Sequence, residues 1–310
     1  MKKVAFLIAA LNEEKNIGNC IDSINKSKYK NKEILVVDGG SKDRTVEIAK
    51  SKGAKVIAET GENKCPANAW NQAIKYTDAE LICLIAADFL VPDEKFIEKV
   101  TAPFDNPKVA CVSTCSKVKE NTLVEKIVSC LDDSTYQNII IKREIALRIG
   151  GFPVIGFGED RIFNIRFLSY VKNHNLLSER VYDTYYSGHT VQTLSALFKQ
   201  SRWYGRTSLI YLKQFYKESA SFLDRIKETA TVNFKMCYFL LFAISFFSIK
   251  TQFFYYFFAP FAIIALITVL KNIKKPYHTL KIFTNIISGG GFFIGILLYV
   301  FGTNRAHGRG

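Results

Sequence analysis

Polar and acidic residues follow the apolar runs near the start of the chain. Asn12 and Glu13 come directly after the run Val4–Ala10, Asp38 ends the second run, and Asp88 stands just beyond the fourth. If these runs are parallel strands, their carboxyl ends meet at one edge of a sheet, which is where open α/β sheets bind ligands. Carboxylates there can accept hydrogen bonds from a ligand or coordinate a hard divalent cation. The spacing therefore predicts a ligand-binding edge.

The elements that would position these residues are visible as alternating strand and helix patterns. Apolar residues recur at helical spacing after the first run, and Asp43 can cap a helix after the second. The fourth run is apolar on both faces, as strands buried in a parallel sheet are. This order predicts an α/β fold with a mostly parallel sheet flanked by helices. The predicted strands are Val4–Ala10, Glu33–Asp38, Lys55–Ile57 and Leu81–Ile85, and the predicted helices include Ile17–Ile24 and Ala67–Tyr76.

The net charge is uneven along the chain. The 310 residues include 42 Lys+Arg and 28 Asp+Glu, a formal net charge of +14. Residues 226–310 contain Glu228 as their one acidic residue and contribute +8 of this excess. A basic excess indicates an anionic partner such as a membrane surface, a phosphorylated substrate or nucleic acid. Zinc-finger spacing, RNP-like aromatic strands and basic helices are missing from the sequence, so we exclude nucleic acid.

Two other classes of site are excluded by spacing. A dinucleotide-binding dehydrogenase needs a G-x-G-x-x-G turn after its first strand, and the turn Ala9–Glu13 contains no glycine. The seven cysteines include no CxxC pair, which argues against a zinc site. Free thiols in a reducing compartment are the favoured interpretation.

The C-terminal region is the most apolar part of the chain and predicts transmembrane helices. Uncharged runs cover 253–270 and 282–301, close to the roughly 20 residues that cross a bilayer. A third span, 232–249, is marginal because Lys235 must reach the interface. Buried helices of a soluble core are the alternative.

The lysines between the last two predicted spans set the orientation. Positive charge concentrates in cytoplasmic loops, so this loop and the large N-terminal region are expected in the cytoplasm. We therefore predict a multi-pass cell-membrane protein with a cytoplasmic domain at 1–225 and a membrane region at 226–310. The lysines concerned are Lys271, Lys274, Lys275 and Lys281.

Five stretches of sequence together resemble the motifs of family 2 inverting glycosyltransferases, which have the GT-A fold. The resemblance covers roughly Val4–Arg206 and implies transfer of a sugar from a nucleotide-sugar donor. A C-terminal membrane region is a common addition in this family. The stretches are Ala9–Glu14, Val36–Thr45, Lys64–Asn71, Arg148–Pro153 with Glu159–Arg166, and Gln200–Arg206.

The resemblance implies a donor site at the predicted sheet edge. Asp38 would accept a hydrogen bond from the nucleobase, Glu13 would hold the ribose, and the backbone of the first loop would frame the base. Two alternatives stay open: Asp38 caps the following glycine bend, or Glu13 is an ordinary acid in the first turn of a helix, favoured by the helix dipole. The implied donor-binding residues in this region are Ala9, Leu11, Glu13, Asp38, Lys64 and Asn68.

The family usually has a D-x-D motif after the fourth strand, and this chain has Ala86-Ala87-Asp88. The resemblance implies that Asp88 contacts the donor diphosphate through Mg²⁺ or Mn²⁺, which stabilises the leaving group as a Lewis acid. His189 is a second candidate ligand, with a structural or surface histidine as the alternative. Because Ala86 stands in place of the first aspartate, we expect the affinity for the donor or the identity of the donor to differ from the family's usual pattern. It also motivates an alternative class, a non-catalytic nucleotide-sugar-binding membrane protein.

An inverting transfer needs a base opposite the leaving group to take the acceptor proton. Chemistry and resemblance both indicate Asp160, at the start of a helix expected over Arg161–Tyr170, and Glu159 is the second candidate. Helix capping is the alternative for both. Arg202 and Trp203 can contact the diphosphate and stack on a sugar, or lie at the headgroup level in an interfacial helix.

The sequence as a whole predicts a membrane-anchored inverting glycosyltransferase. Its acceptor is expected to be a lipid-linked sugar or a lipid phosphate, because the anchor keeps the site near the inner leaflet. A processive polysaccharide synthase is the second choice, since the Gln-x-Arg-Trp spacing at 200–203 is one residue shorter than in such synthases. Donor sugar, nucleobase, linkage and oligomeric state are left open.

Overall fold

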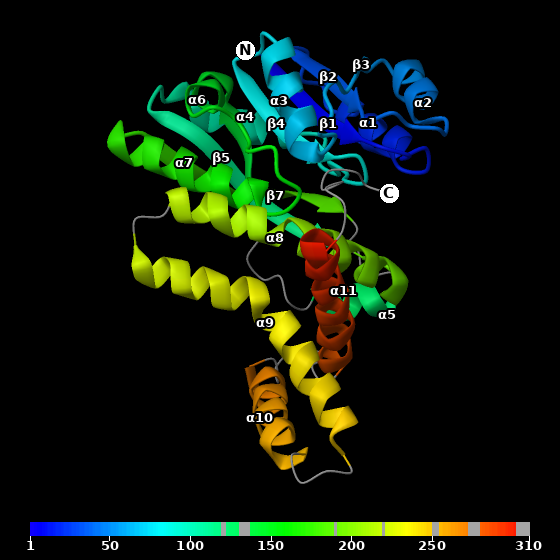
Figure 1. Cartoon of the computed structure of the whole chain (residues 1–310). Helices are drawn as coiled ribbons and strands as arrows, with labels where there is room; N and C mark the ends of the chain where they lie inside the picture. Colours follow the sequence, from blue (N-terminus) through cyan, green and yellow to red (C-terminus); the bar gives the residue numbers. More distant parts are fainter. Residues whose placement is uncertain are drawn as a thin grey trace.

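The N-terminal region is built on a seven-stranded sheet, and helices of the C-terminal region extend away from this sheet (Figure 1). The strands are β1 (Val4–Ala10), β2 (Lys32–Asp38), β3 (Lys55–Ala58), β4 (Leu81–Ala86), β5 (Val109–Val118), β6 (Gln137–Lys142) and β7 (Leu177–Gly188). The computed structural model describes residues 1–118, 122–129, 137–188, 191–218, 221–249, 254–271 and 280–301.

The strand order is β3-β2-β1-β4-β6-β5-β7. Strands β1 to β4 are parallel, β6 is antiparallel to both β4 and β5, and β7 is parallel to β5. The predicted α/β fold with a mostly parallel sheet is confirmed. In register, Ala9 lies beside Val37 on one side and Ala86 on the other, so the carboxyl ends of the three strands meet.

Helices cover both faces of the sheet. Side chains from α1 and α4 pack on one face, and side chains from α3, α6 and α7 pack on the other. The helices of this region are α1 (Ile17–Asn25), α2 (Thr45–Ser51), α3 (Pro66–Tyr76), α4 (Phe96–Thr101), the 3₁₀ turn η1 (Ala102–Asp105), α5 (Leu123–Ser129), α6 (Arg143–Arg148), α7 (Glu159–Asn173) and α8 (Leu194–Glu218).

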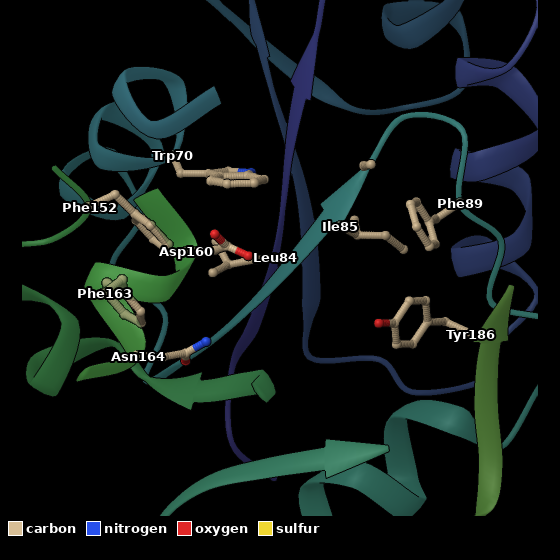
Figure 2. A pocket seen from close by; sticks show the side chains of 10 residues that line it. Trp70, Leu84, Ile85, Phe89, Phe152, Asp160, Phe163, Asn164 and Tyr186 are labelled. Carbon is tan, nitrogen blue, oxygen red and sulfur yellow. The ribbon is translucent and has the colours of Figure 1, made fainter. Parts of the chain in front are cut away.

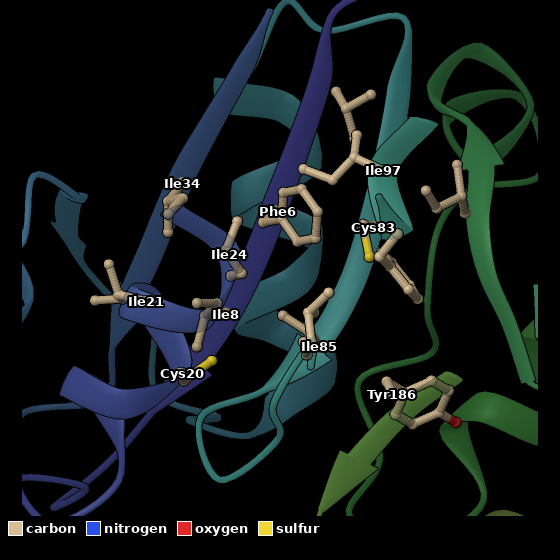
Figure 3. Packing of buried hydrophobic residues seen from close by; sticks show 14 of the residues in the cluster. Phe6, Ile8, Cys20, Ile21, Ile24, Ile34, Cys83, Ile85, Ile97 and Tyr186 are labelled. Carbon is tan, nitrogen blue, oxygen red and sulfur yellow. The ribbon is translucent and has the colours of Figure 1, made fainter. Parts of the chain in front are cut away.

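The alternation of side chains along β1 explains its continuous apolar sequence. Phe6 and Ile8 point to the face covered by α1, where they meet Ile21 and Ile24 (Figure 3). Leu7 points to the opposite face, towards α3. All five side chains are fully buried, as expected for a central parallel strand covered on both sides. This packing fixes the strand ends that carry the candidate site.

The C-terminal helices are α9 (Phe222–Phe247), α10 (Phe254–Lys271) and α11 (Lys281–Phe301). Among the described residues, α9 and the stretch Ile282–Phe301 are long and apolar enough to cross a membrane. The apolar stretch of α10, Phe254–Thr268, is shorter. The structure thus supports two of the three predicted spans by length and composition. It also begins α9 ten residues before the predicted start of the first span at 232, because Ser221 caps it by accepting from the amide of Asp224.

Large aromatic side chains remain uncovered on these helices. Phe247 and Phe301 are each 83% exposed, and Tyr255 and Tyr256 are each 75% exposed. Apolar surface of this extent is typical of a membrane or protein contact. The loop at 272–279, including Lys274 and Lys275, and the side chains of Lys271 and Lys281 lie outside the described residues, so the predicted orientation stays a prediction.

Helices α8 and α11 approach each other backbone to backbone. A Cβ atom at Gly205 would overlap the carbonyl oxygen of Phe292, and one at Gly295 would overlap that of Arg202. Ser201 and Ser288 share a buried hydrogen bond of 2.7 Å across the same contact. In Figure 1 the first part of α9 runs beside α8, while the rest extends away from the sheet with α10. Helix α8 therefore joins the sheet domain to the C-terminal helices.

Candidate active site

Asp38 ends β2, and its carboxylate is bound within the turn that follows. Oδ2 accepts hydrogen bonds from the amides of Gly40 and Ser41 at 2.9 and 3.0 Å, and Oδ1 accepts from the Ser41 hydroxyl at 2.5 Å. Gly40 has a φ of 98°, which glycine adopts without strain. This is the turn-capping arrangement that the sequence left open. A role of Asp38 towards a nucleobase stays a prediction.

The loop after β1 is tied to the same turn. The amide of Asn12 donates to the Ser41 hydroxyl at 2.9 Å, and the amide of Glu13 donates to the Thr45 hydroxyl at 2.7 Å. Because α1 begins only at Ile17 and has no acid in its first turn, the alternative that Glu13 is a first-turn acid is wrong. Glu13 instead lies in the loop at the carboxyl edge of the sheet, where the sequence predicted it.

Asp88 and Glu13 lie close enough to affect one buried thiol. The Cys20 side chain, in α1, donates to the carbonyl oxygen of Ala86 at 3.7 Å. The pKa of Cys20 is raised to about 12, mainly by burial and in part by the negative charges of Asp88 and Glu13. Leu11 closes the edge on the other side, 3.5 Å from the position of a Cβ at Gly39. The loops after β1, β2 and β4 therefore form one continuous acidic edge.

Glu59 directly follows β3 and is a buried acid at this edge that the sequence analysis did not identify. It is 7% exposed, its amide donates to the Asp38 carbonyl at 2.7 Å, and its Oε1 accepts from Asn68 Nδ2 at 2.8 Å. Lys64 reaches across to donate to the Gly39 carbonyl at 3.2 Å. The structure thus brings three predicted donor residues, Asp38, Lys64 and Asn68, together around Glu59.

A pocket of about 120 Å³ lies beside the end of β4 (Figure 2). Asp160 points into it beneath the indole of Trp70, and Leu84 of β4 lies opposite the carboxylate. Aromatic and aliphatic side chains make up most of the wall, and Asp160 is the one acid among the described residues that line it. The lining residues are Trp70, Leu84, Ile85, Ala86, Phe89, Phe152, Asp160, Phe163, Asn164 and Tyr186.

Asp160 stands in the first turn of α7, which confirms and extends the predicted helix. Its Oδ1 accepts from the amide of Arg161 at 2.8 Å, and the helix dipole stabilises negative charge at this position. Glu159 precedes it. Burial is the main cause of the raised pKa of the Cys65 thiol, at the start of α3, and the negative charge of Glu159 contributes to the increase. Only Asp160 of the two lines the pocket.

Two residues of α3 shape the upper wall of the pocket. Asn71 donates to the carbonyl of Phe152 and accepts from its amide, both at 2.8 Å. Gly151 makes this contact possible, because a Cβ there would overlap Asn71 Oδ1. Phe152 in turn packs 5.3 Å from Trp70, whose Nε1 is buried and makes no hydrogen bond within the described part of the chain.

Arg202 and Trp203 lie in α8 and are not among the pocket-lining residues. Trp203 Cζ2 would be 3.2 Å from a Cβ at Gly156, so its ring supports the loop that leads to Asp160. The backbone of Arg202 packs against α11. The donor contacts predicted for these two residues stay predictions.

Asp88 is the one predicted metal ligand that falls within the described residues, since His189 lies outside them. In the described ranges, no group of three or more His, Cys, Asp and Glu side chains is arranged to hold a metal ion. Mg²⁺ in nucleotide enzymes is usually held by one or two carboxylates together with substrate phosphates. A single aspartate just past a parallel strand fits that type of site, in which the donor diphosphate supplies the other oxygens.

Several pocket residues were missed by the sequence analysis although the signals were present. Trp70 and Asn164 stand inside stretches that carried the resemblance, at 64–71 and 159–166. Glu59 gave a weaker signal, an acid after a short strand, and only the structure shows, by its burial and its hydrogen bonds with Asp38 and Asn68, that it belongs to the edge.

The seven-stranded, mostly parallel sheet with helices on both faces is a fold of the GT-A type. Residues 5–158 match the family model described as glycosyl transferase family 2, and the chain belongs to this family. The predicted resemblance is therefore confirmed.

Curated relatives include polysaccharide synthases. The chain is 25% identical over 127 residues to poly-beta-1,6-N-acetyl-D-glucosamine synthase of Staphylococcus aureus (strain COL), which is 40% of this chain and 31% of the relative. It is 27% identical over 150 residues to the same synthase of Staphylococcus epidermidis, which is 46% of this chain and 35% of the relative. The matched region thus spans about a third of these relatives.

Solved structures share the fold at low sequence identity. A mannosyltransferase from Pyrobaculum calidifontis in complex with GDP-Man and Mn²⁺ has a TM-score of 0.63 at 16% identity, covering 97% of this chain and 87% of its own. Glucosyl-3-phosphoglycerate synthase from Mycobacterium tuberculosis, in complex with Mn²⁺, UDP and glucosyl-3-phosphoglycerate, has a TM-score of 0.52 at 20% identity, covering 69% and 80%.

Proposed function

We propose that the protein is a membrane-anchored inverting glycosyltransferase. It transfers a sugar from a nucleotide-sugar to a lipid-linked sugar or a lipid phosphate at the cytoplasmic face of the membrane. The observation that carries the proposal is the position of Asp160, whose carboxylate points into an aromatic-lined pocket beside the end of β4. The acidic edge that includes Asp38 and Asp88 lies at the carboxyl ends of β1, β2 and β4, so it is next to this pocket.

In this proposal the two groups of residues have separate tasks. The loops around Asp38, Glu59 and Asn68 bind the nucleoside of the donor. Asp88 would hold a divalent cation together with the donor diphosphate, and the cation would supply Lewis-acid stabilisation of the leaving group. The structural neighbours that bind Mn²⁺ with UDP or GDP-Man support this assignment.

Asp160 acts on the acceptor. Its Oδ1 already accepts a hydrogen bond from Arg161, which leaves Oδ2 to take the proton of the acceptor hydroxyl. As the acceptor oxygen bonds to the anomeric carbon, the bond from that carbon to the diphosphate breaks on the opposite face, which inverts the configuration. The apolar walls formed by Trp70 and Phe152 keep bulk water from competing with the acceptor.

The C-terminal helices supply the membrane contact. Helices α9 and α11 are long and apolar enough to span, and exposed aromatic residues such as Phe247 would lie in lipid. The +8 charge of residues 226–310 suits anionic lipid headgroups. An acceptor embedded in the same membrane would be held close to the sheet domain that carries the pocket.

The test is a donor screen with the full chain in detergent. UDP-glucose, UDP-N-acetylglucosamine and GDP-mannose are offered with Mn²⁺ and bacterial membrane lipid, and release of nucleoside diphosphate is measured. We expect turnover with one donor, loss of it in Asp88→Ala, and a roughly 10²–10⁴-fold lower kcat in Asp160→Asn with a sugar-hydroxyl acceptor. A phosphate acceptor needs little help from a base, so the Asp160→Asn effect would be much smaller there. Donor binding without turnover across all donors and lipids would instead support the non-catalytic alternative.

A processive polysaccharide synthase is the second candidate, favoured by the synthases among the curated relatives. The length of the product distinguishes the two. A single added sugar per acceptor supports our proposal, whereas a ladder of long chains formed from the first minutes of reaction supports processive synthesis.

A further inference from the structure

Glu228 is unusual for its position in the chain. It is the only acidic residue after position 225, it lies in the first half of α9, and it is 4% exposed. A buried carboxylate is costly unless it is paired and hydrogen-bonded. Its partners therefore indicate what the residue is for.

Both carboxylate oxygens of Glu228 have partners from the domain that carries the pocket. Oε1 accepts from the hydroxyl of Tyr211, in α8, at 2.7 Å, and Oε2 forms an ion pair with Arg161 Nη2, in α7, at 2.5 Å. Burial and the hydrogen bond to Glu228 raise the pKa of Tyr211, so its hydroxyl stays a donor. Three helices thus meet at one side chain.

These partners lie on both sides of Asp160. Arg161 follows it directly and donates its amide to the Asp160 carboxylate. Tyr211 packs against Gly158, the N-cap of α7, so closely that a Cβ there would overlap its ring. The ring centroid of Phe157 lies 5.2 Å from that of Tyr211. The contacts of Glu228 therefore fix the backbone that begins α7, just where the orientation of Asp160 is set.

We propose that Glu228 is a positioning residue for Asp160. Through Arg161 and Tyr211 it holds the first turn of α7 so that the Asp160 carboxylate points into the pocket. This inference rests on the proposed role of Asp160 as the base. It also means that a helix proposed to enter the membrane takes part in orienting the reacting group, although Glu228 itself does not touch the substrate.

The chain offers a matched control for the test. Arg166 and Glu218 form a second ion pair of α7, in this case with α8, with an Nη2–Oε1 distance of 2.6 Å and both side chains 23% exposed. This pair lies further along α7, beyond the turn that carries Asp160. Glu218→Gln and Glu228→Gln each break one ion pair of α7, but only the second releases the start of the helix.

Steady-state kinetics with the donor that supports turnover give the first readout. A misplacement of about 1 Å can cost about 10²-fold in rate, so we expect kcat of Glu228→Gln to fall roughly 10–100-fold with the donor KM unchanged. Glu218→Gln should keep the wild-type kcat. Because Glu228 acts through Asp160, adding Glu228→Gln to Asp160→Asn should lower kcat no further.

Hydrogen–deuterium exchange gives a readout that does not need turnover. The amide of Ile162 bonds to the Gly158 carbonyl at 3.1 Å and reports on the first turn of α7. Peptides covering this amide should exchange at least threefold faster in Glu228→Gln and at the wild-type rate in Glu218→Gln. Tyr211→Phe, which removes one hydroxyl, should show a smaller increase.

Two results would overturn the inference in distinguishable ways. If Glu228→Gln matches Glu218→Gln in kcat and in exchange, Glu228 has no positioning role, and the proposed function is unaffected. If Asp160→Asn keeps the wild-type kcat with a sugar-hydroxyl acceptor, Asp160 is not the base, and the positioning role fails together with that part of the proposed function.

Discussion

Replacing Gly158 by alanine measures how tightly the start of α7 is held against α8. Gly158 has a φ of 75°, and an alanine in this left-handed conformation costs about 1–2 kcal/mol. The new methyl group would also overlap the ring of Tyr211, which is 1% exposed and fixed by its hydrogen bond to Glu228. Overpacking of this kind costs about 1–3 kcal/mol. The two costs together predict a loss of about 2–5 kcal/mol in the free energy of unfolding.

Gly53→Ala is the control, because Gly53 has a φ of 84° and no atom within 4 Å of its Cβ position. At roughly 2 °C per kcal/mol for a chain of this size, Gly158→Ala should lower the Tm in detergent by about 4–10 °C and Gly53→Ala by about 2–4 °C. Adding Tyr211→Leu to Gly158→Ala should cost less than the sum of the single changes. Equal Tm losses for the two glycine variants would refute the steric part of the reasoning.

Three further predictions follow from contacts described above. Gly205→Ala should lower the Tm more than Gly290→Ala. The methyl group at 205 would meet a backbone carbonyl of α11, whereas the one at 290 would meet only an aromatic side chain, 3.1 Å away. Equal losses of Tm would argue against the close contact between α8 and α11. Trp70→Phe should change the Tm by less than about 2 °C, because its indole N–H makes no hydrogen bond with any described residue, and a larger drop would argue for a partner elsewhere in the chain. The hydrogen bond from Arg166 lowers the pKa of Glu218 below its ordinary 4.5. This ion pair therefore stabilises the fold above pH 4.5, and its contribution is lost as the pH falls through the lowered pKa. The Tm difference between wild type and Glu218→Gln should be present at pH 7 and vanish in acid.

The central part of the fold could be predicted because its signals are local. β1 and β4 are apolar on both faces, and their predicted ends differ from the observed ones by at most one residue. The position of β6 in the sheet could not be predicted from local signals. It follows β5 in the chain yet pairs between β4 and β5, and its apolar run at Ile140 and Ile141 gives no indication of which strands it will join. Such a pairing depends on contacts that are distant in sequence.

The candidate site shows the same division. The acidic edge was predicted because each of its residues ends or follows a recognisable strand. The pocket was not, because it depends on the two hydrogen bonds between Asn71 and Phe152, which bring Trp70 to the helix that carries Asp160. The start of α9 was missed for another reason: its first turns carry charged residues, and Glu228 gave no sign that it would be buried.

The contact between α8 and α11 limits how this sequence can change. Where a large side chain opposes a glycine, as Phe239 of α9 opposes Gly290 of α11, a smaller residue on one helix can make room for a larger one on the other, and the two positions can vary together. At Gly205 and Gly295 the opposing atoms are carbonyl oxygens of the partner helix. No substitution on that partner can remove them, so neither glycine has a compensating change available. In a set of homologues that keep this helix pairing, these two positions should stay glycine without correlated changes elsewhere, whereas Gly290 and Phe239 should co-vary.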